Sequence, residues 1–165
     1  MAKKIDPLNK KNINAATPMI VVKDIKAAMG FCQKAFGYKK RGVANGPDGK
    51  PMHAEMRLRD SVLMLSPEYP DHGMRSANTL MGTPVTMYLM TENADKVFAK
   101  AVKLGAKALQ PVMDMFWGDR VGTVVDPDGY TWMVGTHIAE PTPPEMNKKM
   151  KEQMAAMASH AEAGG

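Results

Sequence analysis

Hydrophobic and polar residues follow the same order of patterns twice along this chain. Residues 17–22 have the apolar content of a strand, and residues 25–36 then carry apolar side chains at the i, i+3, i+4, i+7 and i+11 spacing of an amphipathic helix. In the second half, a strand pattern at 84–91 runs into a helical stripe over 94–102. Each stripe ends at a glycine, which favours helix termination. The repetition predicts two related modules.

Three further strands follow the helix in each half. They are expected near residues 38–44, 50–58 and 61–66 in the first half and near 107–113, 120–125 and 130–137 in the second. Thr17 aligns with Thr86 and Met64 aligns with Met133, so the first and last strands of the two halves are related by the same sequence offset. The fold class is therefore α+β, with two tandem β-α-β-β-β modules at 17–66 and 84–137.

Strand alternation separates the two faces of each expected sheet. In the third strand, the side that packs under the helix carries Met52, Ala54, Met56 and Leu58. The opposite side carries His53, Glu55 and Arg57. By the repeat, this second face also includes Thr17, Met19, Val62, Met64, Ser66, Thr86, Tyr88, Arg120, Met133 and His137. Two curved mixed sheets, each with a helix on its back, are expected to join these faces around a cleft.

Several segments resemble the vicinal oxygen chelate superfamily, which includes glyoxalases, bleomycin-resistance proteins and extradiol dioxygenases. They are residues 17–24, 52–58, 61–66 and 84–86, together with the most specific stretch, 116–132. The similarity is greatest to the PhnB-like branch, whose members carry the glyoxalase label. The resemblance implies a homodimer, often with modules exchanged between chains, and a cleft that takes a small molecule.

Metal-dependent members of this superfamily hold a divalent ion with side chains on the first and last strands of each module. The resemblance puts these positions at Thr17, Met64, Thr86 and Met133. A thioether is a soft, neutral ligand and a threonine hydroxyl does not ionise readily, so four such groups would leave the charge of the cation uncompensated. We therefore expect no metal there and no other cofactor, which weakens a lactoylglutathione lyase assignment.

Two polar residues of the third strand are candidates for catalysis. His53 and Glu55 share a face, with Cα atoms about 6.5–7 Å apart, and could act as an acid–base pair. They could also belong to a displaced metal site. Alternatively they form an ordinary polar row in which Arg57 neutralises Glu55.

The remaining candidate ligand contacts lie in the second half. Trp117 and Arg120 could supply an aromatic wall and an anion contact at the rim of the cleft. Alternatively this stretch shapes a hairpin in which Asp119 and Arg120 bond locally. Tyr88 could donate a hydrogen bond to a ligand or could be an ordinary interface tyrosine. The expected ligand-binding set is Thr17, Met64, Thr86, Tyr88, Trp117, Arg120 and Met133.

Composition narrows the classes of function. The net charge is +5, but the leading lysines are not interleaved with aromatic residues, so nucleic-acid binding is not expected. One cysteine, Cys32, argues against a disulfide framework and fits a reducing, cytoplasmic location. No apolar run approaches the ~18 residues that span a bilayer, and no membrane partner is expected. The 17 methionines could suggest copper handling, but most fall on core positions, where methionine is a filler.

The chain is expected to divide into a flexible basic arm (1–14), a glyoxalase/bleomycin-resistance-like domain (15–138), and a proline-rich linker with a C-terminal amphipathic helix (139–165). The favoured function is small-molecule binding without the family metal site, as in sequestration or resistance. The alternative is a glyoxalase-like lyase or isomerase that uses His53 and Glu55, with or without a displaced divalent metal. Whether the protein is an enzyme stays open.

Overall fold

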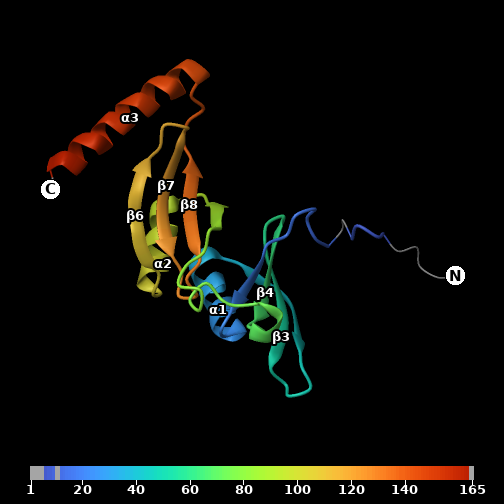
Figure 1. The fold of residues 1–165 in the computed structure, drawn as a ribbon. Coiled ribbons are helices and arrows are strands. Elements are labelled where there is room, and N and C mark those ends of the chain that lie inside the picture. Colours follow the sequence, from blue (N-terminus) through green and yellow to red (C-terminus); the bar gives the residue numbers. More distant parts are fainter. Residues whose placement is uncertain (1–5, 10–11, 164–165) are drawn as a thin grey trace.

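The computed structural model describes residues 6–9 and 12–163, with side chains described up to Ala155, and it contains two four-stranded sheets (Figure 1). The strand orders are β1–β4–β3–β2 and β5–β8–β7–β6. In each sheet the first and last strands of the module run parallel and the other neighbours run antiparallel. The predicted α+β fold with two β-α-β-β-β modules is confirmed.

The elements follow the predicted order in both modules. The first module consists of β1 (Met19–Val22), α1 (Ile25–Phe31), the π-helical segment η1 (Cys32–Phe36), β2 (Lys39–Asn45), β3 (Pro51–Leu58) and β4 (Ser61–Pro67). The second consists of β5 (Thr86–Met90), α2 (Ala94–Lys103), β6 (Lys107–Asp114), β7 (Asp119–Val125) and β8 (Thr131–His137). A short 3-10 helix, η2 (Pro70–His72), lies between the modules, and α3 (Pro143–Ala163) follows them.

Each module's helix begins at a side-chain cap directly after the first strand. The Asp24 carboxylate accepts hydrogen bonds from the amides of Lys26 at 2.8 Å and Ala27 at 3.1 Å. The Asn93 side chain accepts one from the Lys96 amide at 2.9 Å. These caps satisfy amides that have no partner inside the helix. Asp24 and Asn93 are equivalent positions of the repeat, so both modules encode the turn from strand to helix at the same place.

The strand register confirms the repeat and adds one detail. Met19 pairs with Met64 in the first sheet and Tyr88 pairs with Met133 in the second, so the first and last strands keep the predicted offset. In the neighbouring strand, however, Glu55 pairs with Met64, whereas Thr123 pairs with Met133. The offset between β3 and β7 is therefore one residue shorter. Because side chains alternate along a strand, every residue of β7 lies on the opposite face from the one that the repeat predicts.

The two modules contact each other through their helical sides. α2 packs against η1, and the ring of Trp132 in β8 lies 4.7 Å from that of Phe36 and 6.4 Å from that of Tyr38. Trp132 is 2% exposed and lies in the core. Burial raises the pKa of the nearby Cys32 thiol. The helix-free faces point away from this contact, and we call them open face 1 (first sheet) and open face 2 (second sheet).

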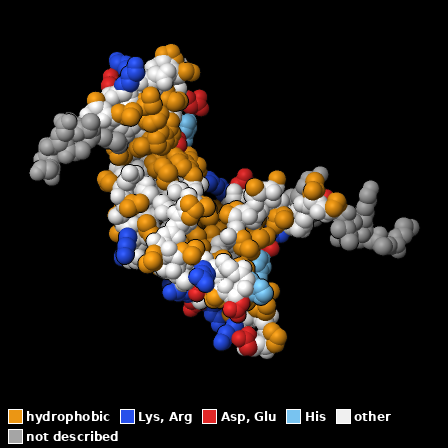
Figure 2. All heavy atoms as spheres, viewed as in Figure 1, with side chains coloured by type: hydrophobic (Ala, Val, Ile, Leu, Met, Phe, Trp, Pro, Cys, Tyr) orange, Lys and Arg blue, Asp and Glu red, His pale blue; other side chains and the backbone are white. Residues whose placement is uncertain are grey.

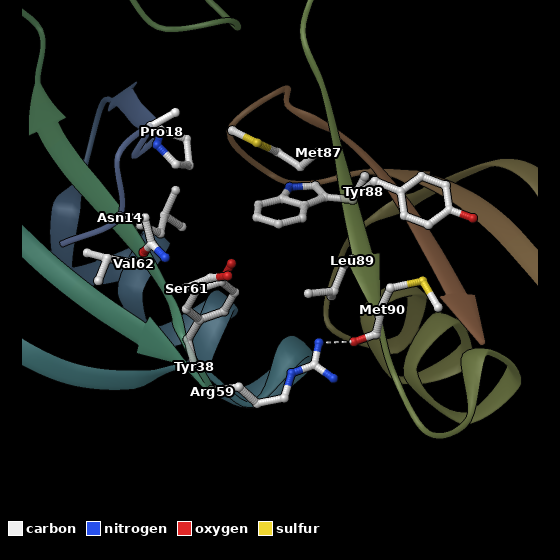
Figure 3. Close-up of a pocket in the computed structure, with 13 residues that line it drawn as sticks. Asn14, Pro18, Tyr38, Arg59, Ser61, Val62, Met87, Tyr88, Leu89 and Met90 are labelled. Carbon is white, nitrogen blue, oxygen red and sulfur yellow. Dashed lines mark hydrogen bonds between the residues drawn. The ribbon is translucent and has the colours of Figure 1, made fainter. Parts of the chain in front are cut away.

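One side chain of each module forms hydrogen bonds with the first strand of the other module, which lies at the edge of its sheet. The Tyr130 hydroxyl, after the β7–β8 turn, accepts a hydrogen bond from the Val21 amide at 3.0 Å and donates one to the Val21 carbonyl at 2.9 Å. Arg59, in the β3–β4 turn, donates to the Met90 carbonyl at 2.5 Å (Figure 3). Val21 and Met90 are again equivalent positions of the repeat. We call these contacts the two clasps; each satisfies backbone groups on an edge strand that would otherwise lack a partner.

The segment between the modules is held by its own hydrogen bonds. The Glu68 carboxylate accepts one from the Ser76 amide at 2.8 Å and one from the Thr79 hydroxyl at 2.5 Å. Hydrogen bonding by the Ser76 side chain, by Thr79 and by the Ser76 amide lowers the pKa of Glu68 to about 2. Ser76 is fully buried, so this connection packs against the modules.

The two ends of the chain differ in their contacts. Of the predicted basic arm, residues 1–5, 10 and 11 lie outside the described residues. The predicted C-terminal helix is present as α3, which projects from the end of the second module (Figure 1). Its Gln153 side chain accepts a hydrogen bond from the Phe116 amide at 3.3 Å. In the part of the chain that the structure describes, no helix has the length and apolar character needed to cross a membrane.

Candidate functional site

Three side chains on open face 2 meet around the carboxylate of Asp119, and we call the four residues together the Asp119 cluster. The Tyr88 hydroxyl donates a hydrogen bond to Asp119 Oδ2 at 2.7 Å, and Trp117 Nε1 donates to the same oxygen at 3.1 Å. His137 Nδ1 lies 2.8 Å from Asp119 Oδ1. The Asp119 side chain is only 13% exposed, whereas that of His137 is 52% exposed. A nearly buried carboxylate thus orients three larger groups.

Strand pairing brings these residues together. Asp119 begins β7 and His137 ends β8, and the register places them directly opposite each other. Tyr88 comes from β5, on the other side of β8, and its ring crosses Gly135. A Cβ atom at Gly135 would lie 3.2 Å from the Tyr88 hydroxyl oxygen, so any larger residue there would crowd the cluster. The absence of a side chain at this position lets the Tyr88 hydroxyl reach across β8 to Asp119.

Trp117 approaches from the turn before β7. The next residue, Gly118, has a φ of 98°, and a Cβ atom there would overlap the Ala139 carbonyl oxygen. Only glycine is compatible with both conditions. The Trp117 ring meets the Phe116 ring edge-on at 4.9 Å. Figure 2 shows hydrophobic side chains gathered over this end of the second sheet, next to α3, so the cluster borders an apolar surface.

Hydrogen bonding sets the charges of the cluster. Burial alone would raise the pKa of the Asp119 carboxyl, but hydrogen bonds from Tyr88, His137 and Trp117 outweigh it and leave that pKa below its usual value. The hydrogen bond to Asp119 raises the pKa of His137. Burial, aided by the bond to Asp119, raises the pKa of Tyr88. At neutral pH the cluster therefore holds an ionised carboxylate, a neutral phenol and an imidazole that takes up a proton more readily than usual.

Open face 1 carries the predicted His53 and Glu55. His53 Nε2 lies 3.7 Å from Glu55 Oε1, so the two residues share a face as predicted, at a distance longer than a hydrogen bond. Glu55 Oε2 is paired with Arg41 at 3.2 Å. Arg57 does not neutralise Glu55 in the way that we considered; it donates to the Asn12 carbonyl at 3.1 Å, and Arg41 donates to the same oxygen. Arg41 thus binds both Glu55 of β3 and the N-terminal segment, whereas Arg57 binds the N-terminal segment.

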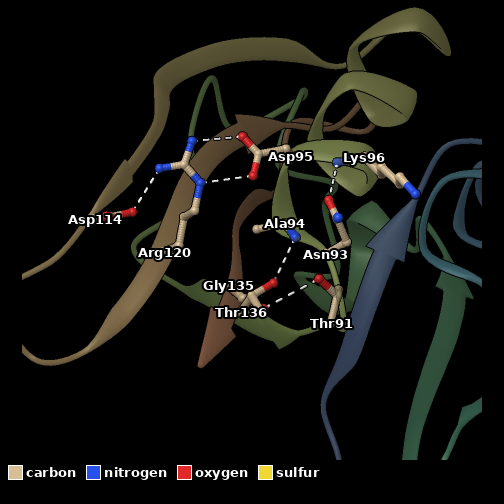
Figure 4. A network of polar contacts seen from close by, with 9 residues as sticks. All are labelled: Thr91, Asn93, Ala94, Asp95, Lys96, Asp114, Arg120, Gly135 and Thr136. Carbon is tan, nitrogen blue, oxygen red and sulfur yellow. Dashed lines mark hydrogen bonds and ion pairs between the residues drawn. The ribbon is translucent and has the colours of Figure 1, made fainter. Parts of the chain in front are cut away.

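The prediction that Arg120 faces the cleft is wrong. Its guanidinium binds Asp95 of α2 through two hydrogen bonds of 2.8 Å and Asp114 of β6 through one of 2.7 Å (Figure 4). Arg120 therefore lies on the helical side, and both carboxylates occupy the group that we expected to contact an anion. The physical reason is the shorter offset between β3 and β7, because a difference of one residue reverses the face of every side chain in the strand.

Comparison with known proteins agrees with this architecture. Residues 13–134 match the profile of the Glyoxalase/Bleomycin resistance protein/Dioxygenase superfamily. The chain belongs to this superfamily. It is 37% identical over 142 residues to an uncharacterized protein of Mycobacterium tuberculosis H37Rv, a match that covers 84% of each chain. An uncharacterized protein of Mycobacterium bovis is likewise 37% identical, over 84% of this chain and 93% of its own.

Two solved structures share the fold. A gene product from Arabidopsis thaliana superposes with a TM-score of 0.61 at 26% identity, covering 74% of this chain and 98% of its own. The fosfomycin resistance protein FosX from Mesorhizobium loti gives a TM-score of 0.57 at 12% identity, covering 80% of this chain and 95% of its own. At that identity the second likeness concerns the fold alone.

Two of the four positions that the resemblance assigns to a metal, Met64 and Met133, carry thioethers. Met64 and Met133 lie half-buried in the last strand of each module, which is an inner strand of its sheet. The register places Met19 and Glu55 beside Met64, and Tyr88 and Thr123 beside Met133. Glu55 is the one carboxylate among these four neighbours, and it is paired with Arg41. A thioether is a poor ligand for the hard or borderline divalent cations that superfamily metal enzymes use. These positions do not fit such an ion.

The two threonines at the remaining metal positions add no suitable ligand. Thr17 precedes β1, and its hydroxyl donates to the Asn14 carbonyl at 3.1 Å. Thr86 is the first residue of β5 and is exposed. Across residues 6–9 and 12–155, no three His, Cys, Asp or Glu side chains are placed to hold a metal ion together.

The predicted ligand-binding residues fall into two groups within the chain. Thr17, Met64, His53 and Glu55 belong to the first module, and Thr86, Tyr88, Trp117 and Met133 belong to the second. A cavity of about 340 Å³ lies between the modules, bordered by residues of β4 and β5 (Figure 3). Of the predicted set, only Tyr88 lines this cavity. One chain therefore does not gather the set around a single hollow.

Sequence reasoning missed the centre of the Asp119 cluster. It named Tyr88 and Trp117 as candidates, but it considered Asp119 only as a local partner in the hairpin and His137 only as a residue of the second face. The signal was present in the hairpin itself, because Asp119 and His137 are the outermost pair of the strands that it joins. Correct register would have placed both on the face of Tyr88.

Proposed function

We propose that this protein binds a small molecule on its open faces without the superfamily metal, in the manner of sequestration or resistance members. The observation that carries the proposal is the pair of thioethers at the metal positions, Met64 and Met133, which form an apolar floor beside Met19 and Tyr88. Polar groups flank this floor on both faces: Glu55 and Arg41 on one, the Asp119 cluster on the other. Such a surface suits an organic molecule with a few polar atoms.

We further infer that the protein is a homodimer in which the first module of one chain faces the second module of the other. Both open faces point away from the contact between modules, and exposed apolar side chains remain on them, including Met19 (53% exposed) and Tyr88 (46% exposed). The Phe116–Trp132 stretch supports the PhnB-like branch, and the lone buried cysteine supports a cytoplasmic location.

Light scattering at several concentrations tests the dimer. Met19→Asp puts a charge on open face 1 and is expected to yield monomers. Met81→Asp is the matched control, because Met81 is 95% exposed in the segment between the modules. A dimer that persists in Met19→Asp, with unchanged affinity, would contradict the arrangement.

Elemental analysis and native mass spectrometry of the purified protein test the binding proposal. We expect no stoichiometric divalent metal and a bound or added small molecule retained by the intact dimer, with bleomycin as the first probe in a titration. A stoichiometric transition metal that is lost on substitution of Met64 or Met133 would contradict the metal-free site.

One observation supports a second candidate function, a glyoxalase-like lyase or isomerase. His53 and Glu55 share open face 1 at 3.7 Å, close enough for a modest rearrangement to join them as an acid–base pair or as two ligands of a displaced metal. His53→Ala separates the two functions. Loss of turnover with ligand affinity retained would favour the enzyme.

A further inference from the structure

The His137 imidazole in the Asp119 cluster has a fixed protonation pattern. Asp119 is ionised at neutral pH, and an ionised carboxylate can only accept hydrogen bonds. The 2.8 Å contact therefore requires a proton on Nδ1 of His137. In the neutral imidazole this leaves the lone pair on Nε2, the nitrogen that acts as a base.

The position of Nε2 leaves it available to a ligand. Its described charged neighbour is Glu140 Oε1 at 3.7 Å, which is beyond hydrogen-bond distance, and the Glu140 side chain is 91% exposed. The His137 side chain is itself 52% exposed on open face 2. Nδ1 is thus held by a nearly buried group, while Nε2 faces the side on which we expect a small molecule.

The rest of the cluster keeps Asp119 rigid. Tyr88 and Trp117 both donate to Oδ2, and Trp117 Nε1 also lies 3.3 Å from the Tyr88 hydroxyl oxygen. Oδ1 is left to His137 alone. Both carboxylate oxygens are therefore occupied, so the imidazole cannot change partners without breaking a network of charge-assisted hydrogen bonds.

We propose that His137, oriented by Asp119, is the general base for proton abstraction from a planar weak carbon acid that lies against the exposed ring of Tyr88. In this step the C–H bond of the substrate breaks, its electron pair stays on the substrate, and the proton forms a new N–H bond at Nε2. The resulting imidazolium is stabilised by the Asp119 carboxylate. In an isomerisation, the proton returns to another atom of the substrate. In an elimination, the electron pair of the broken C–H bond forms a new π bond, and the leaving group departs with the electron pair of its own bond.

The pH dependence of this step follows from the charges around the imidazole. Asp119 on β7 and Glu140 after β8 both favour the protonated ring, and Tyr88 on β5 reaches it only through Asp119. The hydrogen bond to Asp119 is the largest cause of the raised pKa of His137. Base activity is therefore absent at acidic pH and rises as pH increases through a midpoint above the usual histidine value of about 6.5.

Elimination of 5-nitrobenzisoxazole by the full-length protein tests the proposal, because this flat probe reacts at any well-placed base. The base takes the proton from C3 and the N–O bond breaks. The electron pair of that bond stays on the oxygen, which gives the coloured product 2-cyano-4-nitrophenolate. We expect a rate at least about 100-fold above that of the same concentration of imidazole. His137→Gln should remove that excess, whereas His72→Gln, a matched change at an exposed histidine of η2, should retain it.

Asp119 is a positioning residue in this scheme, so its variant has a different signature. Asp119→Asn should lower kcat with KM little changed and move the pH midpoint downward, since the ring loses its anionic partner. A change in folding alone would alter kcat and KM without moving the midpoint. Titration of the His137 ring by NMR in both proteins measures the same midpoint without any probe.

The proposal rests on the proposed function in one respect, that a small molecule occupies open face 2. Binding of the unreactive analogue 5-nitrobenzotriazole separates the two. If the analogue binds and His137→Gln reacts as fast as the wild type, the base is wrong while binding stands. If neither binding nor turnover occurs, the base is overturned, and the small-molecule function is decided by the native mass spectrum.

Discussion

The Tyr130 clasp makes the attachment of the two modules measurable through a single hydroxyl. Tyr130→Phe keeps the ring, which is 8% exposed, and removes the oxygen that bonds both the amide and the carbonyl of Val21. Each of these backbone groups then lacks its partner at a part-buried strand edge. Leaving a buried polar group unsatisfied costs about 1–3 kcal/mol, and partial access of water reduces the sum for two such groups to about 2 kcal/mol.

Urea unfolding at fixed protein concentration measures this loss, and a thermal scan should show Tm lowered by about 4–8 °C for a chain of this length. Tyr69→Phe is the matched control, since among the described contacts the half-buried Tyr69 hydroxyl makes no hydrogen bond. A loss below about 0.5 kcal/mol for Tyr130→Phe would refute the reasoning, because water would then replace the hydroxyl at no cost.

Three further substitutions test charge and backbone geometry. Burial and nearby carboxylates raise the pKa of Asp128 to about 6, whereas in the unfolded chain this carboxyl releases its proton near pH 4. The protonated Asp128 therefore contributes to the free energy of unfolding fully below pH 4, and this contribution is lost as pH rises through 6. Asp128→Asn should therefore stabilise by about 1 kcal/mol at pH 7.5 and not at pH 4, and equal thermal shifts at both pH values would contradict this. Arg120→Met breaks exposed ion pairs with Asp95 and should leave ligand affinity unchanged in a titration. Weaker binding by this variant would instead support the predicted contact between Arg120 and an anionic ligand. Gly118→Ala forces a Cβ against the Ala139 carbonyl and should lower stability by more than about 2 kcal/mol in urea, a result that a wild-type midpoint would exclude.

The fold could be predicted because its signals are local and occur twice. Helix caps at Asp24 and Asn93, glycines at helix ends, and alternation in β3 each act over a few residues, and the repeat checks one half against the other. Buried Ala54 and Met56 lie where alternation placed them. These features needed no knowledge of how the modules meet.

The site was less predictable because it depends on pairing between distant residues. Whether Arg120 faces a ligand or α2 is decided by the length of a turn: Val125 pairs with Thr131 across a longer connection than the one that joins Leu58 to Ser61. The sequence offset between the first and last strands of the two modules carries no information on the lengths of these two connections. The Asp119 cluster depends on the same register, and so it escaped the same reasoning.

The two clasps differ in the number and burial of their hydrogen bonds, and this difference favours opening of the molecule on one side. The Tyr130 side holds by two hydrogen bonds on a buried ring, while the Arg59 side holds by one bond from an exposed side chain. Arg59 also borders the cavity between the modules. We therefore expect thermal separation of the modules to begin on the Arg59 side, where fewer hydrogen bonds must break, and to open the cavity between the modules on that side.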